Sequence, residues 1–368
     1  MLQRKKTQIT TIQTAVFIIS IILGMGVITL PRSVTEFTQT PDGWLSTLVG
    51  AAIVLMLGRI IILLNRYYPG LTWFQYSPFI FGKWIGQMTN FIVLMYLLFI
   101  AAYEVRGLCE VTHIYLLKLT PVHAKMLVII FLGIYLINGG IVSVARLFEI
   151  LLPTTLVIFF LVMALGFKVF ELQNVLPVMG LGVEPILRGL QGTTITFIGF
   201  DFILFLNAFM EKKEKAWIAL VAGVGISSLF YAFVCFMVVG GLGMHLAKAL
   251  TFPTLGLIRS FEVAGILFER YESFLLGVWI TQIFTTYVGM HFFASLGLSQ
   301  ITGKNMRTFT YGLAPLIFLI AATPDNINEF LTMGDIFSYT QVFIVAVLAP
   351  LALGIAWLKN RLFSPGKK

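Results

Sequence analysis

Long apolar runs, separated by short polar turns, constrain the fold of this chain more than any other feature of its sequence. A helix needs about 20 consecutive apolar residues to cross a bilayer, and the chain offers such runs from beginning to end. Only 11% of its 368 residues are charged, against about 25% in an ordinary soluble domain. A soluble protein could not bury this much apolar surface. The runs therefore predict an all-α integral membrane protein with a single membrane domain over residues 1–368.

Turn-forming residues divide the runs into ten predicted spans. The turns include TPDGW at 40–44, YYPG at 67–70 and ATPDN at 322–326. The segment 71–82 is too short and aromatic to span, so we expect it at an interface. Residues 244–270 are expected to form an outside loop with one or two short helices. The predicted spans are 9–37, 43–65, 84–117, 122–139, 143–169, 186–210, 216–243, 271–299, 308–322 and 335–358.

The distribution of positive charge predicts the orientation in the membrane. With the N-terminus in the cytoplasm, most of the 25 Lys and Arg residues fall in cytoplasmic segments, as in MLQRKK at the start and EKKEK at 211–215. Ten spans return the C-terminus to the same side. We therefore expect both termini in the cytoplasm. The net charge of +9 follows this topology, and no basic patch indicates a nucleic-acid partner.

Two predicted spans carry glycines near their middle. The first span contains Gly24 and Gly26, and the sixth contains Gly199, about half the chain length further on. Because each half would hold five spans, two similar halves would lie upside down relative to each other. Interrupted segments at matching positions of inverted halves indicate a binding site near the middle of the membrane. The alternative is that these glycines only allow close helix packing. The predicted repeats are about 9–170 and 185–358, with spans one and six broken.

A broken helix exposes backbone groups that cannot be left without partners in hydrocarbon. The N-terminal end of a half-helix favours a carboxylate, and the C-terminal end favours an ammonium group or a metal cation. A zwitterionic amino acid satisfies both ends at once. The sequence therefore predicts a binding site for a small polar solute such as an amino acid, near 24–27 and 196–200.

Charged residues inside two spans are the candidates for gating or structural roles. A charge at the centre of a membrane helix costs roughly 2.5–3.5 kcal/mol on insertion scales. Asp201 lies in span six, where we expect it to stabilise the break or to link it to span three. In span three, Arg106 and Glu110 are four residues apart and can pair, whereas Glu104 is not on their face. This group is either a neutralised structural pair or a coupling element that reaches Asp201.

Span eight places Thr285 and Thr286 at depth. Their hydroxyls either bond back to their own helix or contact a solute or ion. The sequence has no Walker A motif, HExxH motif, Gly-x-Ser-x-Gly motif or metal-spaced Cys/His cluster. We therefore expect no catalytic residues, no metal site and no enzymatic activity.

Several motifs resemble the B subunits of spore germinant receptors, which belong to the amino acid–polyamine–organocation permease superfamily. The resemblance runs from about residue 7 to 360. Separately, FIGFD at 197–201 is similar to the sixth-helix signature of amino acid permeases in the wider superfamily. The motifs similar to the germinant receptor subunits are GMGVITLPR (24–32), TPDGW (40–44), GKWIG (82–86), TFPT (251–254) and FERYESFLLGVWITQIFTTY (268–287).

This resemblance implies a fold of ten helices in two inverted halves of five, of the LeuT type, with helices one and six unwound around the ligand. In that family the B subunit lies in the inner membrane of the dormant spore, beside an A subunit and a lipoprotein C subunit. It senses a nutrient such as an amino acid, and binding leads to ion release and germination. By position, the implied ligand-binding residues are Gly24, Gly26, Ile100, Tyr103, Thr196, Phe197, Ile198, Gly199, Thr285 and Thr286.

Two other functions remain open from the sequence. The first is an amino acid transporter, coupled to protons or another cation, that uses the same pocket. Some proton-coupled permeases carry a Lys in the fifth helix, whereas this fifth span has Thr154 and Thr155, which weakens that alternative. The second is a scaffold that holds partner subunits and leaves recognition to them.

Overall fold

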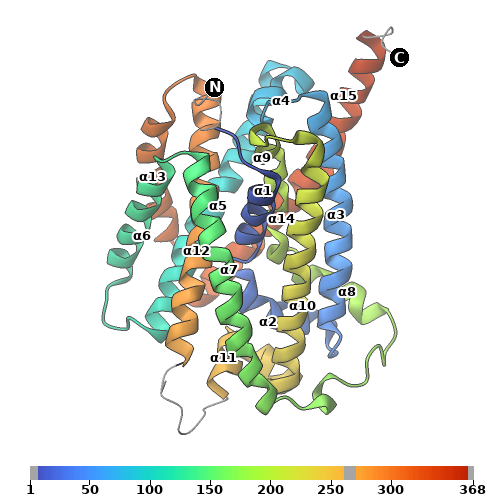
Figure 1. Ribbon diagram of the computed structural model, residues 1–368, viewed down its shortest axis with the longest axis vertical. Coiled ribbons are helices and arrows are strands. Elements are labelled where there is room, and N and C mark those ends of the chain that lie inside the picture. The colour runs from blue at the N-terminus through green and yellow to red at the C-terminus, as the bar shows by residue number, and fades with distance from the viewer. Residues whose placement is uncertain (1–6, 261–270, 364–368) are drawn as a thin grey trace.

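Helices make up nearly all of the secondary structure in the computed structural model (Figure 1), which describes residues 7–260 and 271–363. Within these ranges the β-type pairing is limited to one bridge between Ile9 and Met210. The prediction of an all-α protein is confirmed. In chain order the α-helices are α1 (Thr11–Ile22), α2 (Gly26–Thr38), α3 (Gly43–Tyr67), α4 (Trp73–Phe81), α5 (Lys83–Tyr115), α6 (Val122–Ile137), α7 (Ile141–Leu165), α8 (Glu184–Thr193), α9 (Ile203–Phe209), α10 (Ala216–Ala249), α11 (Pro253–Ser260), α12 (Tyr271–Thr302), α13 (Met306–Ala321), α14 (Ile327–Phe343) and α15 (Ala349–Phe363), with a π-helical turn, Ile344–Leu348, between the last two.

Several of these helices are long and apolar enough to cross a membrane. Within the described residues, five helical segments meet this test alone, and α1 and α2 meet it together as a pair bent by 58°. Helices α6 and α13 are also apolar but shorter, at 16 residues each. The chain is an integral membrane protein, as the composition predicts. The exact number of ten spans and the inverted repeat over 9–170 and 185–358 remain predictions.

The last predicted span, 335–358, begins too late. Helix α14 starts at Ile327, because Asn326 caps it directly after the ATPDN turn. The Asn326 side chain accepts hydrogen bonds from the backbone N–H groups of Asn328 and Glu329, each at 3.1 Å. An Asn in this position satisfies donors that would otherwise lack a partner at a helix N-terminus. The hydropathy pattern did not reveal this more polar first part of the helix.

The predicted outside loop over 244–270 is also partly wrong. Helix α10 continues to Ala249, through a local break at Gly243, whose φ of 70° favours glycine. Helix α11 is one of the short helices expected there, and residues 261–270 lie outside the described residues. The short aromatic segment 71–82 forms the nine-residue helix α4, too short to span a membrane.

Helices α1 and α2 run through the centre of the bundle. Helix α1 packs against α7, α10 and α12, and α2 packs against α8, α10 and α11. The long helices α5 and α12 pack together, as do α3 and α10 (Figure 1). Every residue from Phe17 to Ile22 is buried. A helix that is apolar on all sides is stable only when other helices surround it, which explains the central position of α1.

The two interrupted segments lie side by side. At one end of the bundle, where α1 and α9 meet (Figure 1), Ile9 forms two backbone hydrogen bonds, from its N–H to Phe209 O and from Glu211 N–H to its oxygen, each at 2.9 Å. At the other end, the Ser33 hydroxyl of α2 donates to the Gly192 carbonyl of α8 at 3.0 Å. A Cβ at position 192 would lie 2.7 Å from the Ser33 backbone oxygen, so only glycine allows this approach.

Candidate functional site

The first break separates α1, which ends at Ile22, from α2, which begins at Gly26. The last carbonyl groups of a helix have no partner within the helix. Here two other helices supply donors. The Thr286 hydroxyl of α12 donates to Ile21 O at 3.0 Å, and the Tyr231 hydroxyl of α10 donates to Ile22 O. The last two carbonyl groups of α1 are therefore paired inside the protein.

The predicted ligand contacts Thr285 and Thr286 take part in this pairing. The Thr285 hydroxyl lies 3.1 Å from Ser20 O and 2.7 Å from Gln282 O of its own helix. The Thr286 hydroxyl lies 3.3 Å from the same Gln282 oxygen. Each hydroxyl therefore bonds back to its own helix, as the first alternative expects, and also to the end of α1. A contact with a solute or ion remains a prediction. In this conformation the two side chains hold the break.

The second break lies between α8, which ends at Thr193, and α9, which begins at Ile203. Short 3₁₀ turns replace the α-helix here, and Gly199 adopts a φ of 120°. This backbone conformation is accessible to glycine and strained for other residues. A Cβ at position 199 would also lie 2.5 Å from Cγ2 of Ile21 in α1. Gly199 is therefore needed both for the turn and for the contact between the two breaks.

Asp201 accepts three hydrogen bonds at this second break. Its Oδ1 accepts from the Gly199 N–H at 3.0 Å, from Gln341 Nε2 of α14 at 3.0 Å and from the Tyr96 hydroxyl of α5 at 3.4 Å. Gln341 Nε2 also lies 3.3 Å from the carbonyl oxygen of Phe197. The carboxylate is buried, so these donors replace water around it. Asp201 thus joins the unwound segment to α5, which is span three of the prediction, and to α14.

One tyrosine connects the two breaks. The Tyr231 hydroxyl of α10 reaches Ile22 O at the first break and Thr196 O, at 3.3 Å, at the second. Gly26 leaves the room for this side chain, because a Cβ at position 26 would lie 2.5 Å from Tyr231 Oη. A single side chain from a third helix therefore bridges the two unwound segments.

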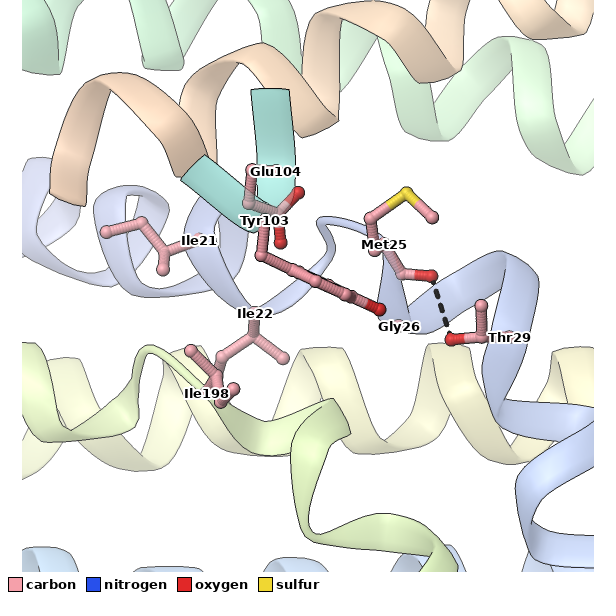
Figure 2. A pocket seen from close by; sticks show the side chains of 8 residues that line it. All are labelled: Ile21, Ile22, Met25, Gly26, Thr29, Tyr103, Glu104 and Ile198. Atoms are coloured by element: carbon pink, nitrogen blue, oxygen red, sulfur yellow. Dashed lines mark hydrogen bonds between the residues drawn. The ribbon is translucent and has the colours of Figure 1, made fainter. Parts of the chain in front are cut away.

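A small cavity lies against the first break (Figure 2). Glu104 and Tyr103 enter it from α5, and Ile198 enters from the unwound segment on the opposite side. The volume of about 10 Å³ is close to the minimum that holds one water molecule. The lining residues are Ile21, Ile22, Met25, Gly26, Thr29, Tyr103, Glu104 and Ile198.

Glu104 contributes an unpaired carboxyl oxygen to this cavity. Its Oε2 is buried and has no hydrogen-bond partner among the described residues. The carboxyl group faces the break, where the backbone of Met25 hydrogen-bonds to it and a Cβ at Gly24 would lie 2.9 Å from Oε1. The buried hydroxyl of Thr196, beside Gly26, also lacks a partner in the same part of the chain. Buried polar groups are rarely left unpaired, so these two atoms indicate a place for a polar ligand.

Arg106 and Glu110 form a separate group. Arg106 Nε lies 2.7 Å from Glu110 Oε1, one helical turn away, and Arg106 Nη1 donates to Ala321 O at 3.3 Å. This pair connects α5 to the end of α13. In the described structure it makes no contact with Asp201, which α5 reaches through Tyr96 instead. The described residues contain no cluster of three His, Cys, Asp or Glu side chains that could hold a metal ion.

The structure distributes the predicted ligand-binding residues over three places. Gly26, Tyr103 and Ile198 line the cavity, and Gly24 and Thr196 lie directly beside its lining residues. Gly199, Thr285 and Thr286 hold the breaks, while Ile100 and Phe197 are buried outside the lining. Ile21, Ile22 and Thr29 were not predicted from the sequence. Met25 was included only within the range 24–27, and Glu104 was predicted as a gating or structural charge, not as a ligand contact. Ile21, Ile22, Met25 and Thr29 lie within about one helical turn of Gly24 and Gly26, and this proximity was the sequence feature that could have identified them. A ligand-binding role for all of these residues remains a prediction.

Two solved structures have a similar fold. One is MHP1, a nucleobase-cation-symport-1 family transporter with bromovinylhydantoin bound, and the other is MhsT in complex with L-phenylalanine. Each is 12% identical to this chain and superimposes with a TM-score of 0.65 over 94% of it, covering 78% of MHP1 and 98% of MhsT. At this identity the likeness concerns the fold alone. The fold class is therefore that of all-helical membrane proteins of the LeuT type.

The sequence comparison defines the family. The sequence profile described as "Spore germination protein" matches residues 8–330. Spore germination protein YndE of Bacillus subtilis (strain 168) is 39% identical over 96% of this chain and 98% of its own. Spore germination protein A2 of the same organism is 35% identical over 96% and 97%, respectively. The chain therefore belongs to the spore germination protein family. This membership confirms the resemblance seen in its motifs. The family is not a family of enzymes.

Proposed function

We propose that this chain is the nutrient-sensing subunit of a spore germinant receptor and that it binds an amino acid at the two breaks. The observation that carries the proposal is the unpaired Oε2 of Glu104, buried against the break between α1 and α2. Membership of the spore germination protein family supports the physiological role. The structure of the cavity supports the ligand class, as follows.

The two charged groups of an amino acid have separate partners in this site. The carboxylate of Glu104 would accept hydrogen bonds from the ammonium group, and such charge-assisted bonds are stronger than neutral ones. The N-terminus of α2 begins at Gly26 without a side-chain cap. The first N–H groups of α2 and its positive dipole end favour the ligand carboxylate. Ile21, Ile22 and Ile198 would then surround an apolar side chain.

The present cavity is too small for this ligand. With about 10 Å³ it has room for roughly one water molecule, so binding requires a wider state of the breaks. A ligand that binds the wider state more tightly shifts the population toward it. The side chains that pair the breaks, Tyr231 and Thr286 among them, would then exchange partners with the ligand. In this proposal that rearrangement is the signal.

The remaining parts of the proposal concern the surroundings of the chain. We place both termini in the cytoplasm because of the charge distribution along the sequence. We place the chain in the inner membrane of the spore because the resemblance to germinant receptor B subunits implies it. We further propose that an A-type subunit and a lipoprotein C-type subunit are its partners, as the resemblance to germinant receptor B subunits implies. No catalytic step forms part of this function.

A second candidate is an amino acid transporter that uses the same pocket. Its support is the likeness in fold to MHP1, a transporter by name. Two measurements on the full chain separate the candidates. The twenty common amino acids are first screened for thermal stabilisation of the purified protein in nanodiscs, and the most stabilising one is then labelled and offered to liposomes that contain the protein. We expect binding without accumulation.

Each other outcome counts against a part of the proposal. Accumulation of the labelled amino acid inside the liposomes would establish transport. Stabilisation by none of the twenty amino acids would contradict the assigned ligand class and would favour a scaffold. In that case bulky substitutions of Gly26 or Ile198 would also leave the concentration dependence of germination unchanged.

A further inference from the structure

A second and larger cleft opens beside the central cavity. Its volume is about 590 Å³, within the range of about 300–1,000 Å³ that is usual for small-molecule sites. Thr29 and Tyr103 line both the cleft and the cavity. The two spaces therefore lie in series, with these two side chains between them. The other residues of the cleft come from α2, α14, the α8 region and the start of α11.

The Tyr103 ring is held by stacking. It lies parallel to the ring of Phe330 in α14, with 4.5 Å between the centroids and 6° between the planes. The ring lies between two carboxyl groups, because Glu104 lines the cavity and Asp335 lines the cleft. A rotation of this one side chain would connect the cleft with the cavity.

The cleft carries charges of both signs. Arg32 and Glu36 lie one turn apart on α2, and Asp335 lies across the cleft on α14. The carboxylates of Glu36 and Asp335 are near enough to influence each other. Within the part of the chain that the structure describes, no ion pair or side-chain hydrogen bond is formed by any of the three. Their charged groups are thus available to a solute in the cleft.

We propose that this cleft is an outer binding site for a zwitterionic amino acid, which precedes the central site. The ammonium group lies between Glu36 and Asp335, and the carboxylate faces Arg32. Polar side chains of Gln191 and Asn328 complete the lining. The ligand class rests on the proposed function, whereas the site itself rests on the cleft and its three charges. An outer site raises the concentration of ligand next to Tyr103 and so loads the central cavity.

The test counts binding sites on the full chain in nanodiscs, with the labelled amino acid that stabilises the wild-type protein most among the twenty common ones. We expect two sites, of which one weakens with increasing salt because its charges face solvent. The double variant Glu36→Gln/Asp335→Asn should bind at one site, insensitive to salt. Glu104→Gln should instead lose the central site and keep the outer, salt-sensitive site. Glu171→Gln, an exposed carboxylate outside the cleft, is the matched control and should keep both.

Each variant exchanges a carboxylate for an amide of the same shape, at exposed positions except for the buried Glu104. We therefore expect unchanged thermal unfolding, and this measurement verifies the fold of every variant. A single wild-type site that Glu104→Gln removes would overturn the outer site and leave the proposed function intact. Two sites that the double variant leaves unchanged would also overturn it. Displacement of the amino acid from the outer site by calcium alone, at constant ionic strength, would identify a cation site instead. Absence of any binding would reject the proposed function as well.

Discussion

Replacing Asp201 by alanine tests how the second break is held. The change removes the acceptor of three donors: the Gly199 N–H, the Gln341 amide and the Tyr96 hydroxyl. A buried donor left without a partner costs about 1–3 kcal/mol. The Tyr96 bond, at 3.4 Å, is long for an O–H donor and contributes least. The two bonds of 3.0 Å therefore account for roughly 2–6 kcal/mol.

An opposing effect lowers this value. The alanine variant no longer has to bury a carboxylate, and that relief offsets part of the loss. We expect a net destabilisation in the lower half of the range, roughly 2–4 kcal/mol. Asp201→Asn retains an acceptor oxygen for the same donors and should cost about 1 kcal/mol or less.

Thermal unfolding of the purified protein in detergent measures both variants. The free cysteines Cys109 and Cys235 are buried, so a thiol-reactive fluorophore reports unfolding without any added label site. Alanine should lower the midpoint clearly, and asparagine should lower it slightly. An alanine variant as stable as the wild type, with unchanged amino acid binding, would refute the role assigned to Asp201.

Three further substitutions probe the same account. Tyr231→Phe should cost about 1–3 kcal/mol in thermal unfolding, because the carbonyl groups at both breaks lose their shared donor; an unchanged midpoint would contradict the role of Tyr231 in connecting the two breaks. Arg106→Met alone should cost about 1–3 kcal/mol, since it leaves the partly buried Glu110 carboxylate without its partner, whereas Arg106→Met/Glu110→Met should cost clearly less. Equal losses in the single and double variants would argue against an ion pair. Gly24→Ala should weaken amino acid binding at normal expression, because the new Cβ would lie 2.6 Å from the Thr286 hydroxyl and 2.9 Å from Glu104 Oε1 and would displace both; wild-type affinity in a titration would show that binding does not depend on the placement of these two side chains.

Much of the fold could be predicted because its physical cause lies in local sequence. The apolar runs determine the helices, and the glycines at 24, 26 and 199 mark the two places where α-helix is interrupted. The start of the last span was missed because its first turns are more polar than a hydropathy window expects, although Asn326 is an ordinary helix cap.

The site was harder to predict because its partners are distant in the chain. Glu104 was grouped with Arg106 and Glu110 as a charge network, although it does not share their helix face. Residues two positions apart in an α-helix, such as Glu104 and Arg106, are about 200° apart around its axis. That rotation places Glu104 in the cavity while the ion pair faces α13. Tyr231 and Gln341 belong to no motif, and only the packing of α10 and α14 brings them to the breaks.

The apolar part of the cavity bears on selectivity. Ile21, Ile22 and Ile198 surround the space next to the break. A hydrophobic wall separates ligands that differ by one methylene by only about 1–3 kcal/mol. We therefore expect several small or apolar amino acids to bind with graded affinity, and the shared ammonium and carboxylate groups to be required of all.

The most direct test of the central claim is a binding titration of the wild-type protein and Glu104→Gln in nanodiscs, with the amino acid that stabilises the wild type most. Loss of a hydrogen bond to a charged group corresponds to about 1.5–3 kcal/mol, or roughly 10- to 150-fold in Kd. We predict that Glu104→Gln weakens central-site binding by at least tenfold while Glu171→Gln does not. An unchanged central-site Kd in a folded Glu104→Gln protein would contradict the account.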